Sequence, residues 1–218
     1  MHSNRLIDLS FAVALMTIAG YVDAIGYLRL GHLFVSFMSG DSTQFAVFIA
    51  DGKWQRALAP GAIVALFVAS VFIGRMIELR TKGWCRSVLL CSEALLLGAA
   101  IVTIRFADVG TILMVIAMGV QNTVIRHVGE TRTAVTYVTG ALVDLGEKIG
   151  DLVCGPGRGE PWAWATYFAF WLGLVIGAGA GGYLYVRIGA EALAVPTVLL
   201  LSFAIAAAIP SLRARAAK

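Results

Sequence analysis

The chain has 218 residues, of which 59% are hydrophobic and only 14% are charged, with 17 Lys and Arg against 13 Asp and Glu. Soluble domains carry about 25% charged residues, so a chain with a mean hydropathy of +0.84 has too little polar surface to fold in water. The composition indicates an integral membrane protein. The apolar composition excludes a disordered chain and a secreted disulfide scaffold. It also excludes a nucleic-acid-binding domain, because the basic residues lie mostly in short gaps between apolar runs, where membrane topology places them.

Six apolar stretches are long enough to cross a bilayer as helices, which takes about 20 residues. The first follows one arginine and precedes no A-x-A-like cleavage site, so it is interpreted as a retained helix and not as a signal peptide. The expected fold is an all-α polytopic membrane protein that forms a single domain. In chain order the expected spans are Leu9–Leu28, Leu58–Met76, Val88–Ile104, Thr111–Val128, Trp162–Val186 and Ala192–Ile209.

Two further segments are apolar only in part. Leu33–Ala50 has a polar centre, and Thr133–Leu152 starts apolar and then becomes amphipathic. Neither segment can face lipid along its whole length, so each must pack on protein or line a wet cavity. We expect two interrupted or half-length helices in these places.

The distribution of basic residues favours six crossings over eight. Eight crossings leave the two sides with nearly equal numbers of Lys and Arg. If both irregular segments enter and leave on one side, most of the 17 basic residues fall on the side of both termini. The positive-inside rule then places both termini in the cytoplasm.

Two stretches about 100 residues apart are alike. Val35–Gly40 aligns with Val135–Gly140 at six identical or chemically similar positions, and upstream Gly20–Asp23 aligns with Gly119–Asn122. The expected repeats are residues 10–106 and 107–210. Because three crossings per repeat is an odd number, the two repeats are expected to be inverted, as in many transporters whose substrate site lies at the repeat interface near the midplane.

The paired motifs resemble a known family. Gly20 to Thr43 reads GYVDAIGYLRLGHLFVSFMSGDST, and Met118 to Arg126 reads MGVQNTVIR, followed by TYVTG at Thr136 to Gly140. Together they resemble the YoaK-like family of bacterial inner-membrane proteins, a domain of unknown function. The resemblance implies a protein of about six spans in the bacterial inner membrane and supplies no substrate.

Asp23 is an acid within the first expected span, and placing one there costs about 3 kcal/mol. It either lies near the interface and snorkels or caps, or it is a buried carboxylate that binds a cation, carries a proton or orients a substrate. Its counterpart Asn122 is polar but does not titrate.

The polar centre of the first irregular segment is the second candidate. The simplest structural account is that Asp41 and Ser42 cap a half-helix that runs to Ala50. The functional alternative is a ligand at the helix start, where a free Asp41 charge disfavours a simple anion site. The candidate binding residues here and in the matching half-helix are Ser39, Gly40, Asp41, Ser42, Thr43, Thr136, Thr139 and Gly140.

Three polar residues near the end of the fourth span complete the candidate set. Gln121 and Asn122 are amides in an apolar run and are expected to face the interior. Arg126 either snorkels or pairs with Asp23. Glu93, inside the third span, either reaches back to Arg86 at the interface or is buried for a function.

Small residues recur every four positions in two helices. Gly173, Gly177 and Gly181 do so in one, and Gly61, Ala65 and Ala69 in the other. Such spacing allows helix backbones to approach closely. Internal packing is the simpler interpretation, and a homodimer contact is the alternative.

These observations predict a small transporter embedded in the lipid bilayer that moves a small polar or ionic solute and uses protons through Asp23 or Asp41. The alternatives are an ion channel and a structural or partner-binding subunit. No enzyme motif such as HExxH or GxSxG is present, and the Cys and His residues lack ligand spacing. We therefore expect no enzyme, no metal and no cofactor.

Overall fold

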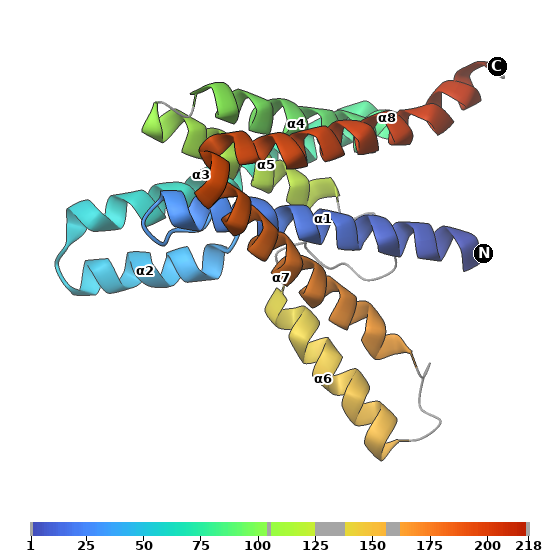
Figure 1. Ribbon diagram of the computed structural model, residues 1–218, viewed down its shortest axis with the longest axis horizontal. Coiled ribbons are helices and arrows are strands. Elements are labelled where there is room, and N and C mark those ends of the chain that lie inside the picture. Colours follow the sequence, from blue (N-terminus) through green and yellow to red (C-terminus); the bar gives the residue numbers. More distant parts are fainter. Residues whose placement is uncertain (1, 104–105, 125–137, 156–161, 217–218) are drawn as a thin grey trace.

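The computed structural model describes residues 2–103, 106–124, 138–155 and 162–216, and the regular secondary structure of these residues is entirely helical (Figure 1). This confirms the expected all-α class. Short 3-10 turns, η1 (Lys82–Trp84) and η3 (Gly189–Leu193), precede α4 and α8. The helices are α1 (His2–Arg29), α2 (Met38–Ala50), α3 (Trp54–Thr81), α4 (Cys85–Thr103), α5 (Ala107–Val124), α6 (Val138–Cys154), α7 (Ala163–Ile188) and α8 (Ala194–Ala216).

Four helical stretches of the described chain are long and apolar enough to cross a membrane. The last of them is 47 residues long and contains α7 and most of α8, and α5 contributes a shorter apolar helix. Each of the six expected spans overlaps one of α1, α3, α4, α5, α7 and α8, and the ends of two expected spans, at 104 and 125–128, lie outside the described residues. The stretches are Ile7–Arg29, Trp54–Thr81, Cys85–Thr103 and Ala163–Ile209, and the shorter helix is Val109–Val124.

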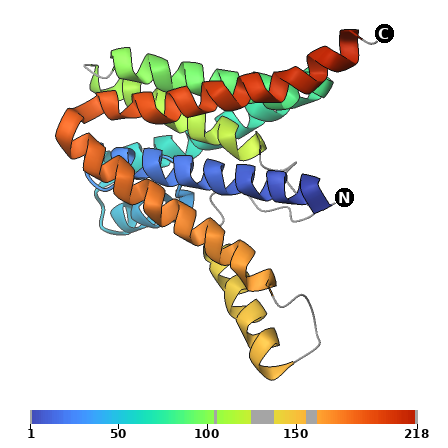
Figure 2. The same cartoon turned by 45° about the vertical axis from the view of Figure 1, so that its right-hand side comes forward.

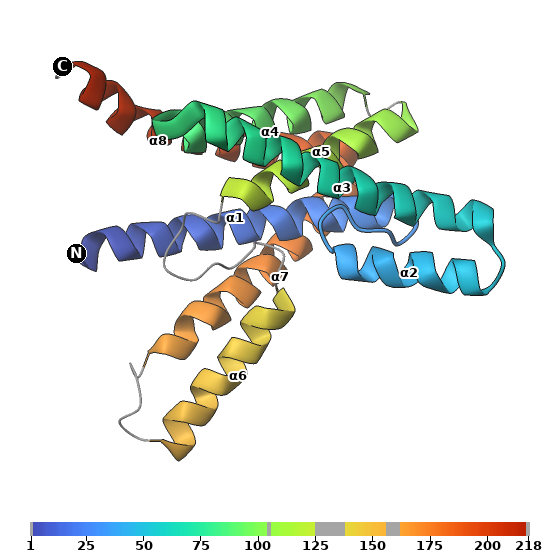
Figure 3. The same ribbon diagram turned by 180° about the vertical axis from the view of Figure 1, so that it is seen from behind.

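The two irregular segments form short helices. Leu33–Phe37 is not helical, and α2 then runs for 13 residues. At 1.5 Å per residue such a helix is about 20 Å long, less than the roughly 30 Å of a hydrocarbon core. α2 packs against α3, and α6 packs against α7 (Figure 3). α2 spans Met38–Ala50, and α6 is described from Val138, where the described part of this region starts.

Corresponding helices of the two halves run in opposite directions. In Figure 1, α1 leads away from the end that carries the N-terminus, whereas α5 leads back toward it, and α3 and α7 are opposed in the same way. The two termini lie at the same end of the molecule. Figure 2 shows α6 beside the first half of α7, apart from the remaining helices.

The α7 glycines pack inside the molecule. α1 and α7 are in contact, and a Cβ placed on Gly177 would lie 1.9 Å from the Thr17 carbonyl oxygen. A Cβ on Gly181 would lie 2.3 Å from the Tyr21 carbonyl oxygen, and one on Gly20 of α1 would lie 2.2 Å from the Leu174 carbonyl oxygen. The small residues allow the two backbones to touch, which confirms the internal-packing interpretation for this helix.

On α3 internal packing holds for only part of the matching stripe, and a homodimer contact stays a prediction for the rest. Ala65 and Ala69 are exposed, and Gly61 lies against the Phe45 ring of α2. The contact between α3 and α5 uses another face, where a Cβ on Gly119 would lie 2.5 Å from the Ser70 Cβ. Small-residue spacing shows that a helix can approach a neighbour closely. Two faces of α3 carry small residues, and the face with Ser70 and Gly74 is the one in contact with α5.

The core lies where α1, α4 and α5 meet, and apolar side chains cover much of the outside of α3, α7 and α8. Exposed examples on these helices are Val68, Phe72, Ile176, Val198 and Ile205. An apolar exterior fits a lipid environment. The largest fully buried apolar side chains are Leu15, Ile25, Leu89, Leu90, Leu97, Met114, Met118, Leu193 and Leu200.

Candidate functional site

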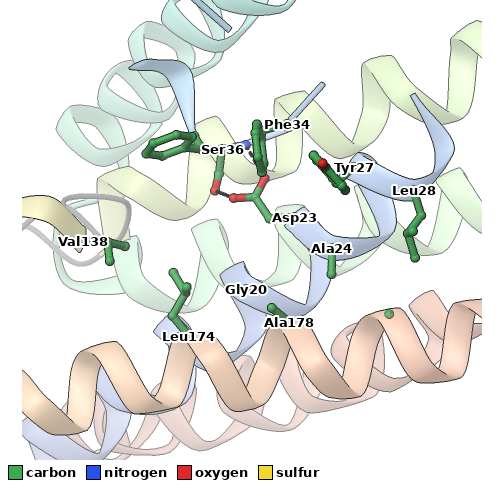
Figure 4. A pocket seen from close by; sticks show the side chains of 12 residues that line it. Gly20, Asp23, Ala24, Tyr27, Leu28, Phe34, Ser36, Val138, Leu174 and Ala178 are labelled. Carbon is green, nitrogen blue, oxygen red and sulfur yellow. Dashed lines mark hydrogen bonds between the residues drawn. The ribbon is translucent and has the colours of Figure 1, made fainter. Parts of the chain in front are cut away.

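Asp23 anchors the chain segment that follows α1. Its Oδ1 accepts hydrogen bonds from the backbone N–H groups of Val35 (2.9 Å) and Ser36 (2.8 Å), and its Oδ2 accepts one from the Ser36 hydroxyl (Figure 4). Leu33–Phe37 has no helical partners for its N–H groups, so a carboxylate inside the protein satisfies them. The acid in the first span therefore has a structural task.

Asp41 acts on the same segment from the first turn of α2. Its side chain is fully buried, and Oδ1 accepts a hydrogen bond from the Phe34 N–H at 3.1 Å. Oδ2 is buried and has no hydrogen-bond partner among the described residues. Three consecutive N–H groups, those of Phe34, Val35 and Ser36, thus donate to two carboxylates.

Local sequence explains why the chain turns back at this point. Gly31 (φ 62°) and His32 (φ 76°) adopt left-handed conformations directly after α1, which a glycine accepts without strain. The returning segment lies close to α1, because a Cβ on Gly26 would be 2.8 Å from Val35 Cγ1. The Gln44 side chain then donates to the His32 carbonyl at 2.9 Å and ties α2 to the turn.

A cavity of about 530 Å³ lies between this segment and the second half of the chain. α1 and the returning segment form one wall, and α7 and the start of α6 form the other (Figure 4). Asp23 is the charged side chain among the described lining residues, and Ser36 and Tyr27 add hydroxyl groups. The remaining lining residues are Gly20, Ala24, Leu28, Phe34, Phe37, Val138, Leu174, Ala178 and Gly182.

Of the predicted binding residues in the described chain, only Asp23 lines the cavity. Ser42 and Thr43 donate to carbonyls of their own helix, at Met38 (2.7 Å) and Ser39 (2.9 Å). Ser39 and Thr139 are exposed, and Gly140 is buried in the first turn of α6. Gly40 lies against the Phe37 ring. Arg126 and Thr136 lie outside the described residues.

The predicted amides, Gln121 and Asn122, face the interior, but they lie on α5 and away from the cavity between α1 and α7. The Gln121 Nε2 donates to the Leu15 carbonyl of α1 at 3.3 Å, and the Asn122 Nδ2 donates to the Met118 carbonyl of its own helix at 2.8 Å. Both side chains are buried. They lie on α5 and not among the described residues that line the cavity.

The predicted cap of α2 is wrong. Asp41 and Ser42 do not cap α2, because the helix begins at Met38 and its N-cap Phe37 has no side-chain hydrogen bond. The Asp41 carboxylate instead accepts a hydrogen bond from the Phe34 N–H in the preceding segment.

Glu93 does not reach back to Arg86. Its carboxylate is fully buried and has no hydrogen-bond partner among the described residues. Arg86 instead approaches Asp8 at 3.5 Å and stacks over the Phe11 ring at 4.5 Å. Both of these partners lie on α1. They are far from Arg86 in the sequence, so the local sequence around Arg86 could not identify them.

The sequence analysis missed most of the cavity wall. Ser36 lies within the repeated motif Val35–Gly40, two residues before α2 begins. That position was the available signal that Ser36 belongs to the cavity wall. Nothing in the local sequence singles out Leu174 and Ala178, because they become lining residues only when α7 packs on α1. No group of three or more His, Cys, Asp or Glu side chains in the described part of the chain is placed to hold a metal ion.

Comparison with known proteins gives one family and two curated relatives. The family model described as a protein of unknown function (DUF1275) matches residues 11–206. The chain is 33% identical over 205 residues to the UPF0700 transmembrane protein RA0705 of Rhizobium meliloti (strain 1021), covering 92% of this chain and 86% of that protein. It is 32% identical over 162 residues to the UPF0700 transmembrane protein YoaK of Bacillus subtilis (strain 168), covering 68% of each. No solved structure matches the chain significantly.

Proposed function

The chain belongs to the DUF1275 family of membrane proteins of unknown function, as the resemblance of its paired motifs predicted, and from the geometry of its cavity we propose that it is a small-solute transporter. The observation that carries the proposal is the cavity between α1 and α7, which contains a membrane acid. α1 belongs to the first expected repeat and α7 to the second. A solute held there contacts both halves of the protein.

The arrangement of the helices supports an inverted repeat. α1 packs on α7, and their counterparts α5 and α3 pack on each other. Gly20 lies against the Leu174 carbonyl in the first pair. In the second pair, a Cβ added to its aligned partner Gly119 would lie 3.0 Å from the Phe67 carbonyl oxygen. Opposed helix directions and one short helix in each half support the same interpretation (Figure 1).

In this proposal the two halves move relative to each other around the solute. The glycine contacts of α1 with α7 bring backbone against backbone, so the two helices can pivot without interlocked side chains between them. Such motion exposes a site at the repeat interface to each side of the membrane in turn. The transported species is a small polar or ionic solute, and the mechanism contains no enzymatic step.

The proposal extends to proton coupling through Asp23. Its carboxylate holds the N–H groups of Val35 and Ser36 and also borders the cavity. Protonation weakens these charge-assisted hydrogen bonds, so the position of Leu33–Phe37 depends on the proton occupancy of Asp23. A proton and a solute then influence the same wall of the cavity, which is the requirement for coupling two transported species.

The test is uptake by proteoliposomes that contain the purified full-length protein. Wild type, Asp23→Asn and the matched control Asp8→Asn are given a panel of radiolabelled organic amines, amino acids and small sugars, with and without a pH gradient. We expect saturable uptake of one class by wild type and the control, stimulation by the gradient, and loss of that stimulation in Asp23→Asn. Non-saturating current would instead establish a channel. A folded protein that moves none of these solutes above protein-free liposomes contradicts a carrier for them and favours a partner-binding subunit.

A further inference from the structure

The cavity combines one acid with an aromatic and apolar lining. In Figure 4 the Asp23 carboxyl lies between Ser36 and Tyr27, close to the Phe34 ring, while Leu174 and Ala178 lie on the opposite wall and Leu28 lies further along α1. The Tyr27 and Phe34 ring centroids are 5.0 Å apart, and those of Phe34 and Phe37 are 5.2 Å apart. A continuous run of three rings therefore lies beside the acid.

Among the described residues, the charges of this region are unbalanced. Asp23 receives hydrogen bonds from two N–H groups and one hydroxyl, all of them neutral donors. Asp41 binds the neighbouring N–H of Phe34 and adds a second carboxylate nearby. No cationic side chain of the described residues forms an ion pair with either acid. A carboxylate taken out of water is stabilised by an opposite charge, and the space next to Asp23 is the place for one.

The aromatic rings favour the same sign of charge. The face of a phenyl or phenol ring attracts a cation within about 6 Å of its centroid, and the attraction grows when water is excluded. Tyr27 and Phe34 line the cavity together with Asp23. An acid beside aromatic faces is a recognised arrangement for organic ammonium groups.

On the basis of the proposed function, we infer that the solute is a monovalent organic cation: one positively charged centre, such as a protonated amine, a quaternary ammonium or a phosphonium, on an apolar body. The charged centre lies between the Asp23 carboxylate and the Tyr27 and Phe34 rings. The apolar body lies against Leu28, Leu174 and Ala178.

Other solute classes fit the lining less well. An anion meets the Asp23 charge without a described cation to bind it. A sugar needs many hydrogen-bond partners, and only Asp23, Ser36 and Tyr27 of the described lining side chains carry oxygen atoms. A dehydrated Ca²⁺ ion takes six to eight oxygen ligands and Mg²⁺ about six, which exceeds the same supply. The volume of about 530 Å³ falls in the range of sites for small organic ligands.

The experiment compares two probes of matched shape and opposite charge, tetraphenylphosphonium and tetraphenylborate. Binding of each is measured by isothermal titration to the purified full-length protein in detergent, with protein-free micelles as the blank. The variants are Asp23→Asn, Tyr27→Leu and the control Asp8→Asn, which changes an acid on the same helix away from the cavity. Asp23→Asn is expected to fold, because asparagine keeps an acceptor for the N–H groups of Val35 and Ser36.

We expect wild type and Asp8→Asn to bind the phosphonium and not the borate. Affinity for the phosphonium falls about tenfold or more in Asp23→Asn and several-fold in Tyr27→Leu. Equal binding of both probes, or phosphonium binding that Asp23→Asn leaves unchanged, overturns the inference. If proteoliposomes instead move a neutral or anionic solute in an Asp23-dependent manner, the transporter proposal stands and the cation inference fails. If the phosphonium binds through Asp23 but the proteoliposomes move no organic amine, the cation site stands and the transporter proposal fails.

Discussion

Asp23 on α1 and Asp41 on α2 bind consecutive N–H groups of one short segment: Asp41 accepts from Phe34, and Asp23 accepts from Val35 and Ser36. The two acids thereby fix the turn of chain that separates α1 from the half-helix. In the second half of the alignment their counterparts are Asn122 and Ala141. The acid pair is thus confined to one half of the chain, although both halves contain a short helix in the aligned region.

Replacing Asp23 tests how strongly the segment depends on it. Asp23→Ala leaves two N–H groups and a hydroxyl without their acceptor, so we expect a loss of about 2–4 kcal/mol in unfolding free energy. Asp23→Asn keeps an acceptor and is expected to cost less than about 1 kcal/mol. Denaturation of the purified protein in mixed micelles measures both. Equal losses in the two variants would show that charge, and not hydrogen bonding, holds the segment.

The two acids are expected to be energetically coupled. Once Asp23→Ala has released Leu33–Phe37, Asp41→Ala has less native structure left to disrupt, so the double variant loses less stability than the sum of the single variants. A coupling of about 0.5–3 kcal/mol is typical of residues in one hydrogen-bond network. The same denaturation assay on the four proteins gives the value, and strict additivity contradicts a shared role.

Gly177 and Gly179 are two positions apart on α7 and should respond in opposite ways. A Cβ on Gly177 meets the Thr17 carbonyl oxygen at 1.9 Å, whereas one on Gly179 has open space within 4 Å. Gly177→Ala forces α1 and α7 apart and is expected to cost about 1–3 kcal/mol. Gly179→Ala should be neutral or stabilise the helix by up to about 1 kcal/mol. A melting curve in detergent separates them, and a neutral Gly177→Ala would place α1 further from α7 than the structure does.

Glu93 carries two buried oxygens without a hydrogen-bond partner among the described residues. Replacing an unsatisfied buried polar group by an apolar one of similar shape is neutral or stabilising. Glu93→Leu is therefore expected to raise or preserve the melting temperature, and Glu93→Gln should not exceed it. A clear fall in Glu93→Leu contradicts this expectation. If Glu93→Leu folds normally but loses uptake, the acid has a functional role.

The short helix α2 should enter and leave the membrane on one side. His32 before it and Lys53 after it are both exposed, and Gly83 after α3 is exposed beyond the far end of that helix. In a variant with Cys85, Cys91 and Cys154 replaced by serine, cysteines at positions 32 and 53 are expected to react with an impermeant maleimide from the same face. A cysteine at position 83 should react from the opposite face. Labelling of positions 32 and 53 from opposite faces contradicts the inverted repeat.

The sequence determined the class of the protein and the order of its helices. Hydropathy over about 20 residues is a local property, so it located α1, α3, α4, α5, α7 and α8 without knowledge of their neighbours. The repeated motif likewise indicated a short helix in each half, although α2 begins at Met38 and not at the predicted cap of Asp41 and Ser42. An acid within an apolar run is costly wherever it packs, which is why Asp23 could be singled out from sequence.

Only the tertiary structure decided which groups meet. Asp23 binds residues 12 and 13 positions further along the chain, and the cavity wall opposite it comes from α7. Periodicity shows which residues share a helix face, but it does not show which face a neighbour covers, so Ser70 and not Ala69 packs toward α5. Partners such as Ser36 and Leu174 are selected by the close approach of whole helices, and that approach depends on the shapes of both surfaces at once.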